Sequence, residues 1–329
     1  MKEKNRISIP LKYKDQIKSL CWVNNFLIDY VGGNVVISLD GKIQEQRVNF
    51  AYRFDSAVST RNGSYSAIYE RFGTKGLVLN RGKIVREINR SYYCAEAYEY
   101  PICFINLEGD NVGLIHCPRE YNIIEIENAT SGERLTENGR EETDFFHSRL
   151  EVSPGQRWLL SAGWIWHPLD SIQLFDLSSG LGDPKRYTPF WDGNLGEIGL
   201  WEVNAATFID DTKILLAGKG DEEQEDALEA LGLVVFDLET KSVISRQELD
   251  KPAGMLMAAG SEHAVSFYEN PVLLHLASGK VIHEWPDIPT DKRNSSISHH
   301  VLNSIIAADA ENKRFAVATS NSIEVVTLG

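Results

Sequence analysis

Side chains that could bind a metal ion occur in three loop-like stretches of the sequence. His167 follows Trp166 in GWIWHPLD, Glu197 lies in DGNLGEIGLW, and His299 and His300 are adjacent in SSISHHV. Imidazole and carboxylate groups are suitable ligands for zinc or iron. Because side chains alternate along a strand, adjacent histidines seldom bind the same ion. We therefore expect no metal and no cofactor, and keep these four His and Glu residues as the candidates for a metal site.

Motifs for nucleophilic catalysis and for phosphate binding are missing from the sequence. No Gly-x-Ser-x-Gly stretch occurs, and the glycine-rich pieces YVGGN and GKGDEE lack the Lys-Ser/Thr of a phosphate-binding loop. The sequence therefore favours a protein without a catalytic centre of these kinds.

The four cysteines are Cys21, Cys94, Cys103 and Cys117, and no two of them form a Cys-x-x-Cys pair. Their wide spacing argues against a zinc knuckle. Three of them lie in apolar runs (LCWV, ICFI and LIHC). We expect buried free thiols in a reducing compartment.

Heavy aromatic residues gather where one apolar run turns into the next, in LLSAGWIWHPLDSIQLFDL (159–177). In an extended strand Trp164 and Trp166 point to one side and Ile165 to the other. Pro168 then bends the chain, and Asp170 is placed to cap the turn. A tight hairpin needs no tryptophan, so we interpret these residues as part of a binding surface.

The predicted partner-binding face combines these aromatic residues with acidic ones from nearby loops. Its members are Trp164, Trp166, His167, Asp170, Trp191, Asp192, Glu197, Trp201, Asp221, Glu222, Glu223, Glu225 and Asp226. Large aromatic side chains with a polar end are enriched at protein interfaces. An alternative remains open, in which the tryptophans pack between neighbouring sheets and the acids lie in a solvated loop.

The acids at 221–226 belong to an insertion at about 219–232, in the stretch GKGDEEQEDALEALGL. Acidic residues ahead of Ala227–Leu231 favour the start of a short helix, because its amino end carries positive partial charge. The spacing of these acids does not match a calcium-binding EF-hand loop.

The charge of the chain limits its partners. Asp and Glu number 47 against 33 Lys and Arg, which gives a formal net charge of -14. Such a protein repels a phosphate backbone, so we expect no nucleic-acid binding and favour basic partners. No apolar run approaches the roughly 18 residues of a membrane span, and the first residues lack the apolar core of a signal peptide. We expect a soluble cytoplasmic protein.

A unit of short strands recurs along the chain. Its clearest part is an apolar strand, a polar turn and a second strand, as in ISLDGKI (37–43), LVLNRGKIV (77–85), FDLETKSVI (236–244) and LHLASGKVI (274–282). Successive units at each end of the chain are separated by roughly 40 residues, the length of one four-stranded propeller blade. The acidic insertion lies in the fifth unit.

The last unit supplies three strands, in SIIAADAENKR, FAVATSN and SIEVVTL. The segment RISIPLKY (6–13) precedes the first complete unit and can pair outside Ser322–Leu328. We therefore predict an all-β protein, a closed β-propeller of about seven four-stranded blades in one domain (1–329). The amino-terminal strand completes the last blade, which removes its open edge.

This pattern resembles the WD40-like and quinoprotein-like propeller superfamilies over nearly the whole chain. The WD40 signatures are missing from the repeats, since no unit ends in Trp-Asp and none opens with Gly-His; the nearest equivalents are Phe-Asp at 175–176 and at 236–237. The stretch HSRLEVSPGQRWLLSAGWIWHP is similar to repeats of uncharacterised bacterial propeller proteins, which implies a prokaryotic source. The resemblance implies a functional face built from the loops between second and third strands and from those that lead from the fourth strand to the next blade.

We expect a non-enzymatic protein-interaction module, monomeric by default, with a bacterial antitoxin or immunity-type protein as one specific form. The first alternative is a metal-dependent propeller hydrolase such as a lactonase, which would use His167, Glu197 and His299 or His300. The second alternative is a sensor that binds a small ligand in the central channel.

Overall fold

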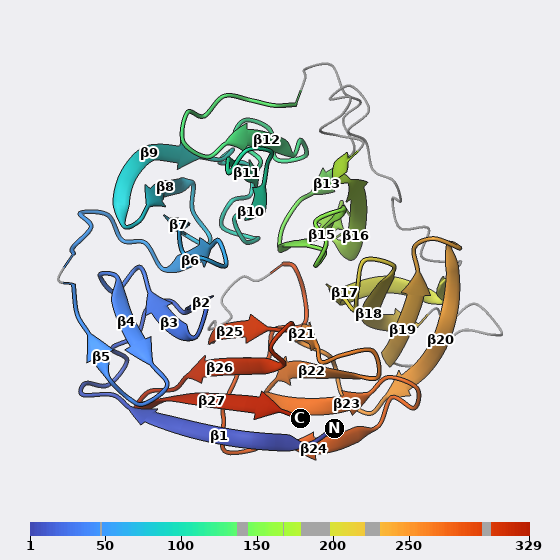
Figure 1. Cartoon of the computed structure of the whole chain (residues 1–329). Coiled ribbons are helices and arrows are strands. Elements are labelled where there is room, and N and C mark those ends of the chain that lie inside the picture. The colour runs from blue at the N-terminus through green and yellow to red at the C-terminus, as the bar shows by residue number, and fades with distance from the viewer. Residues whose placement is uncertain (47, 137–143, 167, 179–197, 221–230, 298–303) are drawn as a thin grey trace. The chain divides into compact units, whose positions relative to one another are not determined.

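The computed structural model describes the chain except for residues 47, 137–143, 167, 179–197, 221–230 and 298–303. Within the described ranges the strands form seven antiparallel sheets, six of four strands and one of three (Figure 1). Most of these sheets are simple meanders in chain order. This is the strand content of a seven-bladed β-propeller, and it confirms the predicted fold class.

The chain divides into two compact units. Unit 1 comprises Met1–Lys2 and Asn138–Asn303, and unit 2 comprises Glu3–Glu137 and Ser304–Gly329. Unit 2 holds four sheets. Their strands are β2 (Cys21–Val23), β3 (Phe26–Asp29), β4 (Val35–Ser38) and β5 (Ile43–Gln44); β6 (Ser56–Ser59), β7 (Tyr65–Tyr69), β8 (Lys75–Asn80) and β9 (Lys83–Asn89); β10 (Ile102–Asn106), β11 (Val112–His116) and β12 (Glu125–Asn128); and β1 (Glu3–Pro10), β27 (Ser322–Leu328), β26 (Arg314–Ala318) and β25 (Ile305–Asp309).

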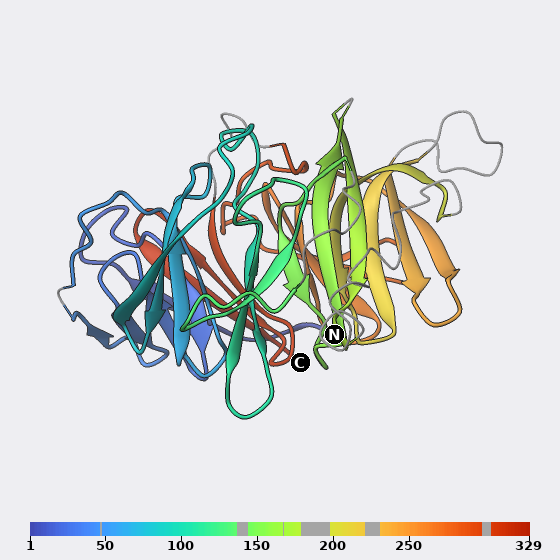
Figure 2. The same ribbon diagram turned by 90° about the horizontal axis from the view of Figure 1, so that it is seen from above.

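Unit 1 holds three sheets. Their strands are β13 (Phe145–Phe146), β14 (Leu150–Val152), β15 (Trp158–Ile165) and β16 (Leu169–Asp176); β17 (Leu200–Phe208), β18 (Lys213–Gly220), β19 (Leu231–Asp237) and β20 (Ser242–Leu249); and β21 (Met255–Ala258), β22 (His263–Tyr268), β23 (Asn270–His275) and β24 (Val281–Glu284). Figure 2 shows the green and yellow strands of the first two sheets running alongside one another.

The amino-terminal strand completes the last sheet of unit 2. Strand β1 pairs antiparallel with β27, with Ile7 opposite Val325 and Ile9 opposite Ile323. The two strands lie side by side at the bottom of Figure 1. Ile9 is buried, and Arg6 donates to Glu324 at 2.9 Å. The pairing predicted from the sequence is therefore confirmed, and the edge of β27 is covered.

The first sheet of unit 1 has an interrupted first strand. Both β13 and β14 pair with β15, at its end and at its middle respectively. The backbone of Phe146 crosses so close to Gly163 that a Cβ there would lie 2.0 Å from its carbonyl oxygen. Only glycine allows this approach, so the tip of β15 and the short β13 are held together.

Alternation along β15 builds the core between the first two sheets of unit 1. Trp158, Leu160 and Ala162 lie on one face and pack in a buried cluster with residues of β17, β18 and β19. Each fully buried large apolar side chain contributes roughly 1.5–3 kcal/mol relative to exposure. The same face of β15 continues to Trp164 near the end of the strand. The alternation that builds the core therefore also sets the side on which Trp164 lies.

Candidate functional site

Four members of the predicted binding face fall in the described part of the chain: Trp164, Trp166, Asp170 and Trp201. The other members lie outside it, and they are His167, Trp191, Asp192, Glu197, Asp221, Glu222, Glu223, Glu225 and Asp226. The metal candidates His299 and His300 also lie outside the described residues.

Three aromatic rings are stacked at the end of β15. The Phe146 and Trp164 ring centroids are 3.8 Å apart with an interplanar angle of 8°. Trp164 and Trp166 follow at 5.6 Å and 27°. The two indoles lie on the same side of the chain, which confirms the prediction from strand alternation. Offset stacking of this kind holds each ring in one orientation.

The two indoles of the stack differ sharply in exposure. Trp164 is 4% exposed, whereas Trp166 is 51% exposed. Trp164 therefore packs inside the unit, in agreement with the alternative that the tryptophans serve as packing residues. Its ring lies under that of Trp166. Trp166 presents a large part of its ring to solvent in an orientation fixed by the rings beneath it.

Trp201 lies at the same end of unit 1. It is the second residue of β17 and is 43% exposed. Strands β15 and β16 pair up to Ile165 and Leu169, and the backbone N–H of Asp170 lies 3.4 Å from the carboxylate of Glu202, the residue after Trp201. Two half-exposed indoles thus flank one end of the first two sheets. We call Trp166 and Trp201 the indole pair.

Asp170 is almost completely buried, at 1% exposure. Its carboxylate accepts hydrogen bonds from Ser296 N, at 2.6 Å, and from Asn204 Nδ2, at 3.0 Å. Among the described residues the carboxylate thus bonds distant parts of the sequence and not the turn that it was predicted to cap. Asp170 supports the site from inside instead of contacting a partner directly.

The partly buried Arg149 completes this polar cluster. Its Nη2 donates to Ser296 Oγ at 2.6 Å and to the carbonyl oxygen of Asn204 at 2.8 Å. Burial lowers the pKa of Arg149, and the negative charge of Asp170 offsets part of that shift. Ser296 is thus held between a cation and an anion, each of which also bonds Asn204.

Glu202 connects the cluster to β18. Its carboxylate accepts from the backbone of Asp170 and pairs with Lys219, the residue before the end of β18. Lys219 opposes Glu202 in the strand register. Strand β18 ends at Gly220, which pairs with Leu200, the residue before Trp201.

The sequence analysis missed Phe146, Arg149, Asn204 and Ser296. Phe146 had a local signal, because the pair Phe145-Phe146 precedes a strand that could pair with WIW. The sequence carries no such signal for Arg149, Asn204 and Ser296. A polar residue in a strand or loop is expected to face solvent as long as its partners are unknown.

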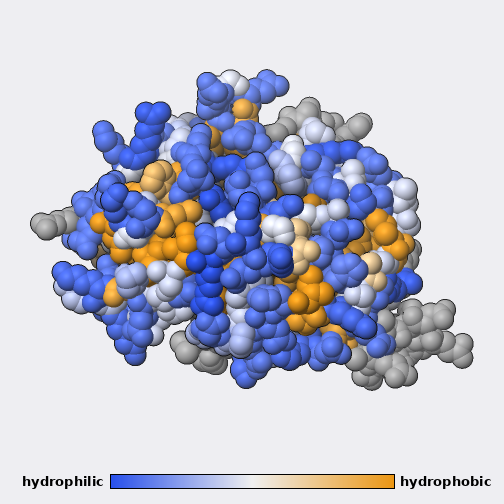
Figure 3. All heavy atoms as spheres, turned by 60° about the horizontal axis from the view of Figure 1, so that its bottom comes forward, coloured by the Kyte–Doolittle hydropathy of each residue, from blue (hydrophilic) through white to orange (hydrophobic). Residues whose placement is uncertain are grey.

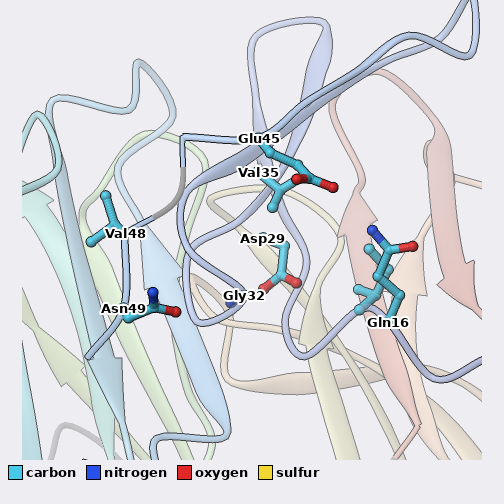
Figure 4. A pocket seen from close by; sticks show the side chains of 8 residues that line it. Gln16, Asp29, Gly32, Val35, Glu45, Val48 and Asn49 are labelled. Carbon is cyan, nitrogen blue, oxygen red and sulfur yellow. Dashed lines mark hydrogen bonds between the residues drawn. The ribbon is translucent and has the colours of Figure 1, made fainter. Parts of the chain in front are cut away.

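A cleft of about 350 Å³ lies elsewhere, in unit 2 beside β3 and β4. Figure 4 shows the carboxylate of Asp29 near Gly32, with Gln16 and Glu45 also on its wall. The Asp29 carboxylate already accepts hydrogen bonds from Lys18 N, Ser19 and Gly32 N, at 2.8–3.0 Å. The Asp29 carboxylate therefore serves to fold its own loop.

The described residues hold neither a metal-ligand cluster nor a membrane-spanning helix. Groups of three or more His, Cys, Asp or Glu side chains arranged to hold a metal do not occur among them. No helix in those ranges has the length and apolar character needed to cross a bilayer. On the face shown in Figure 3, hydrophobic residues form small groups separated by hydrophilic ones.

None of the four cysteines, all of which lie in the described part of the chain, forms a disulfide bond. Cys21 and Cys117 are buried, as expected, whereas Cys103 is only partly buried. Burial raises the pKa of the Cys21 thiol to about 12. A thiol with so high a pKa is unreactive at neutral pH, which fits a packing role.

No protein-family model and no curated protein matches the sequence. The fold is widely shared: 828 chains of solved structures match it. One of them, from "Crystal Structure of Mitotic Checkpoint Complex", covers 99% of this chain and 91% of its own length, with a TM-score of 0.59 and 12% identity. The protein has the fold of that chain. At this identity the likeness carries the fold and no function.

Proposed function

We propose that the protein is a non-enzymatic protein-interaction module that binds its partner at the indole pair. The observation that carries this is the half-exposed Trp166, held in a stack on the buried Trp164 and Phe146. A large apolar ring that is already fixed loses little conformational freedom on binding. Tryptophan is also the residue type most enriched among binding hot spots.

Two general properties support the proposal. The similar solved chain belongs to a multi-protein complex by its title, so this fold serves in protein assembly there. The net charge of -14 favours a basic partner through long-range attraction. An antitoxin or immunity-type role against a basic toxin is the specific form that fits both properties. Membership of the WD40-like or quinoprotein-like superfamilies stays a prediction from the sequence pattern.

The test compares affinity capture by the wild type with capture by a Trp166→Ala, Trp201→Ala double variant. Partners are quantified by mass spectrometry from a lysate of the source organism. We expect at least one specific partner to be lost by roughly 30-fold, which corresponds to about 2 kcal/mol for a binding hot spot. The matched control is Tyr92→Ala in unit 2, which removes an aromatic ring that is 85% exposed.

Tyr92→Ala should capture the wild-type set of partners. The proposal is wrong if the double variant folds normally and also captures the complete set. Elemental analysis of the purified protein tests the hydrolase alternative independently, because that reaction needs a stoichiometric metal.

A further inference from the structure

Thr290–Ile297, the segment that follows β24, spans unit 1 and is tied at both ends; we call it the strap. At one end Thr290 N donates to the carbonyl oxygen of Glu269, and Glu269 N donates to that of Asp291, both at 2.8 Å. Lys292 also pairs with the Glu269 side chain at 2.7 Å. These contacts fix the strap to the turn between β22 and β23, in the third sheet.

The other end of the strap is held by the first sheet. Ser296 N donates to Asp170 at 2.6 Å, and Ser296 Oγ receives a hydrogen bond from Arg149 at the same distance. Ser296 is 1% exposed, and its hydroxyl lies 3.3 Å from the carbonyl oxygen of Ala162 on β15. The strap therefore crosses from the third sheet of unit 1 to the first, where the buried Asp170 and the partly buried Arg149 hold its end.

Asp170 contacts the chain next to both exposed indoles, through its backbone on both sides and through its carboxylate at Asn204. Asp170 is the strand partner of Trp164, on which Trp166 is stacked. Its backbone N–H meets Glu202, the residue after Trp201, and its side chain meets Asn204 on the same strand. One buried residue thus contacts the support of Trp166, the start of β17 and the strap.

We propose that Asp170 is a positioning residue, which clamps the strap through Ser296 and so holds Trp166 and Trp201 at a fixed spacing for the partner. This inference rests on the proposed function, since the spacing of the two indoles matters only if a partner binds to both. Asp170 would act without touching the partner, because its side chain is buried. Losing the clamp should loosen the strap and the indole pair together.

Asp211 provides a matched control at the opposite end of the same two sheets. Its carboxylate accepts from Ser153 Oγ at 2.6 Å and from Gly155 N at 2.8 Å, so it also joins the first sheet to the second. Asp170→Asn and Asp211→Asn are therefore the same chemical change at two ends of one structure. In either variant an acceptor oxygen becomes an NH₂ donor, which faces a donor already present.

The first measurement is amide hydrogen exchange of the full-length variants. Asp170→Asn should speed exchange in peptides covering the strap and the start of β17 by about tenfold or more, while peptides of β21–β24 stay unchanged. Asp211→Asn should leave the strap at the wild-type rate. Unchanged exchange in the strap of Asp170→Asn would overturn the clamp.

If Asp170→Asn does not fold, Ser296→Pro replaces it. Proline has no backbone N–H, so this variant removes the hydrogen bond that the Asp170 carboxylate accepts, and faster exchange in the rest of the strap is expected. A wild-type exchange rate in the strap of Ser296→Pro would overturn the clamp.

The second measurement is capture of the partner that the indole-pair double variant loses. Asp170→Asn should capture about tenfold less of this partner than the wild type. Asp211→Asn should capture the wild-type amount, even if its melting temperature falls as much as that of Asp170→Asn. Faster exchange in the strap with full retention of that partner would overturn the positioning role. If the indole-pair variant loses no partner, the proposed function fails, and hydrogen exchange still decides whether the clamp exists.

Discussion

At each end of the first two sheets of unit 1 an aspartate bonds neighbouring segments, but the tryptophan beside it is buried at one end and half exposed at the other. At one end Asp211 bonds the β14–β15 turn, and the indole of Trp158 is buried at 2% exposure, with its Nε1 donating to Asp211 O at 3.0 Å. At the other end Asp170 bonds Asn204 and the strap, and Trp166 stays half exposed. Trp158 and Trp166 lie on the same face of the same stretch of chain.

This difference separates structural from functional tryptophans. Trp158 has a partner for its N–H, a cation over its ring from Arg157 at 4.7 Å, and apolar neighbours in the core. Trp166 has a ring beneath it and solvent above. An indole that a fold holds rigidly but leaves uncovered is available to a partner, and the buried end shows how the same fold covers one.

The largest contrast is expected from replacing the two tryptophans. Trp158→Ala should lower the free energy of unfolding by about 3–5 kcal/mol, because it leaves a cavity and an unpaired carbonyl group. Trp166→Ala should lower it by about 1 kcal/mol or less, since the half-exposed ring loses only its stacking with Trp164 and Phe146. Urea denaturation of both variants measures this. Equal losses would mean that Trp166 is a structural residue.

The two aspartates should differ less. Asp170→Asn should cost about 2–3 kcal/mol, because a buried carboxylate with charged and polar partners loses both its charge and an acceptor. Asp211→Asn should cost about 1 kcal/mol, since Asp211 is partly exposed. Thermal unfolding at pH 7 compares them. A larger loss of stability in Asp211→Asn than in Asp170→Asn would contradict our conclusion that the hydrogen bonds of Asp170 hold the structure together more strongly than those of Asp211.

A smaller, pH-dependent effect is expected at Glu151, on β14, which contacts β17 between the two ends. Burial raises the pKa of Glu151 from 4.5 to about 7, although Phe208 N and Thr207 Oγ1 donate to its carboxylate at 3.2 and 2.9 Å. The folded state then holds the proton more tightly than the unfolded state. The stability from this group is present below about pH 4.5 and is lost as pH rises to about 7.

Glu151→Gln should therefore match the wild type near pH 4.5 and exceed it at pH 8 by about 1–3 kcal/mol. Chemical denaturation at a series of pH values measures the difference. The Gln side chain keeps an acceptor for Thr207 and Phe208, so packing is conserved. A wild type that gains stability over the variant between pH 4.5 and 7 would contradict the assigned direction.

The sequence was sufficient for the features that depend on local pattern. Strand alternation placed Trp164 and Trp166 on one side, and the spare amino-terminal segment 6–13 predicted the pairing with Ser322–Leu328. Both follow from a period of two and from the need to cover a sheet edge. The exposure of each tryptophan did not follow, because it depends on Phe146, which reaches the stack through a break in the first strand.

The role of Asp170 could not be predicted from the sequence. Its two side-chain partners are 34 and 126 residues away, and nothing in SSISHHV marks Ser296 as the residue that enters the core. A carboxylate beside a turn normally bonds its own backbone. In this protein the Asp170 carboxylate bonds Asn204 and Ser296.

The most direct test of the account is hydroxyl-radical footprinting of the protein with and without its captured partner. Oxidation of Trp166 and Trp201 should fall several-fold in the complex, while Tyr92 in unit 2 and the buried Trp158 keep their rates. Protection of Tyr92, with Trp166 and Trp201 oxidised as fast as in the free protein, would contradict binding at the indole pair.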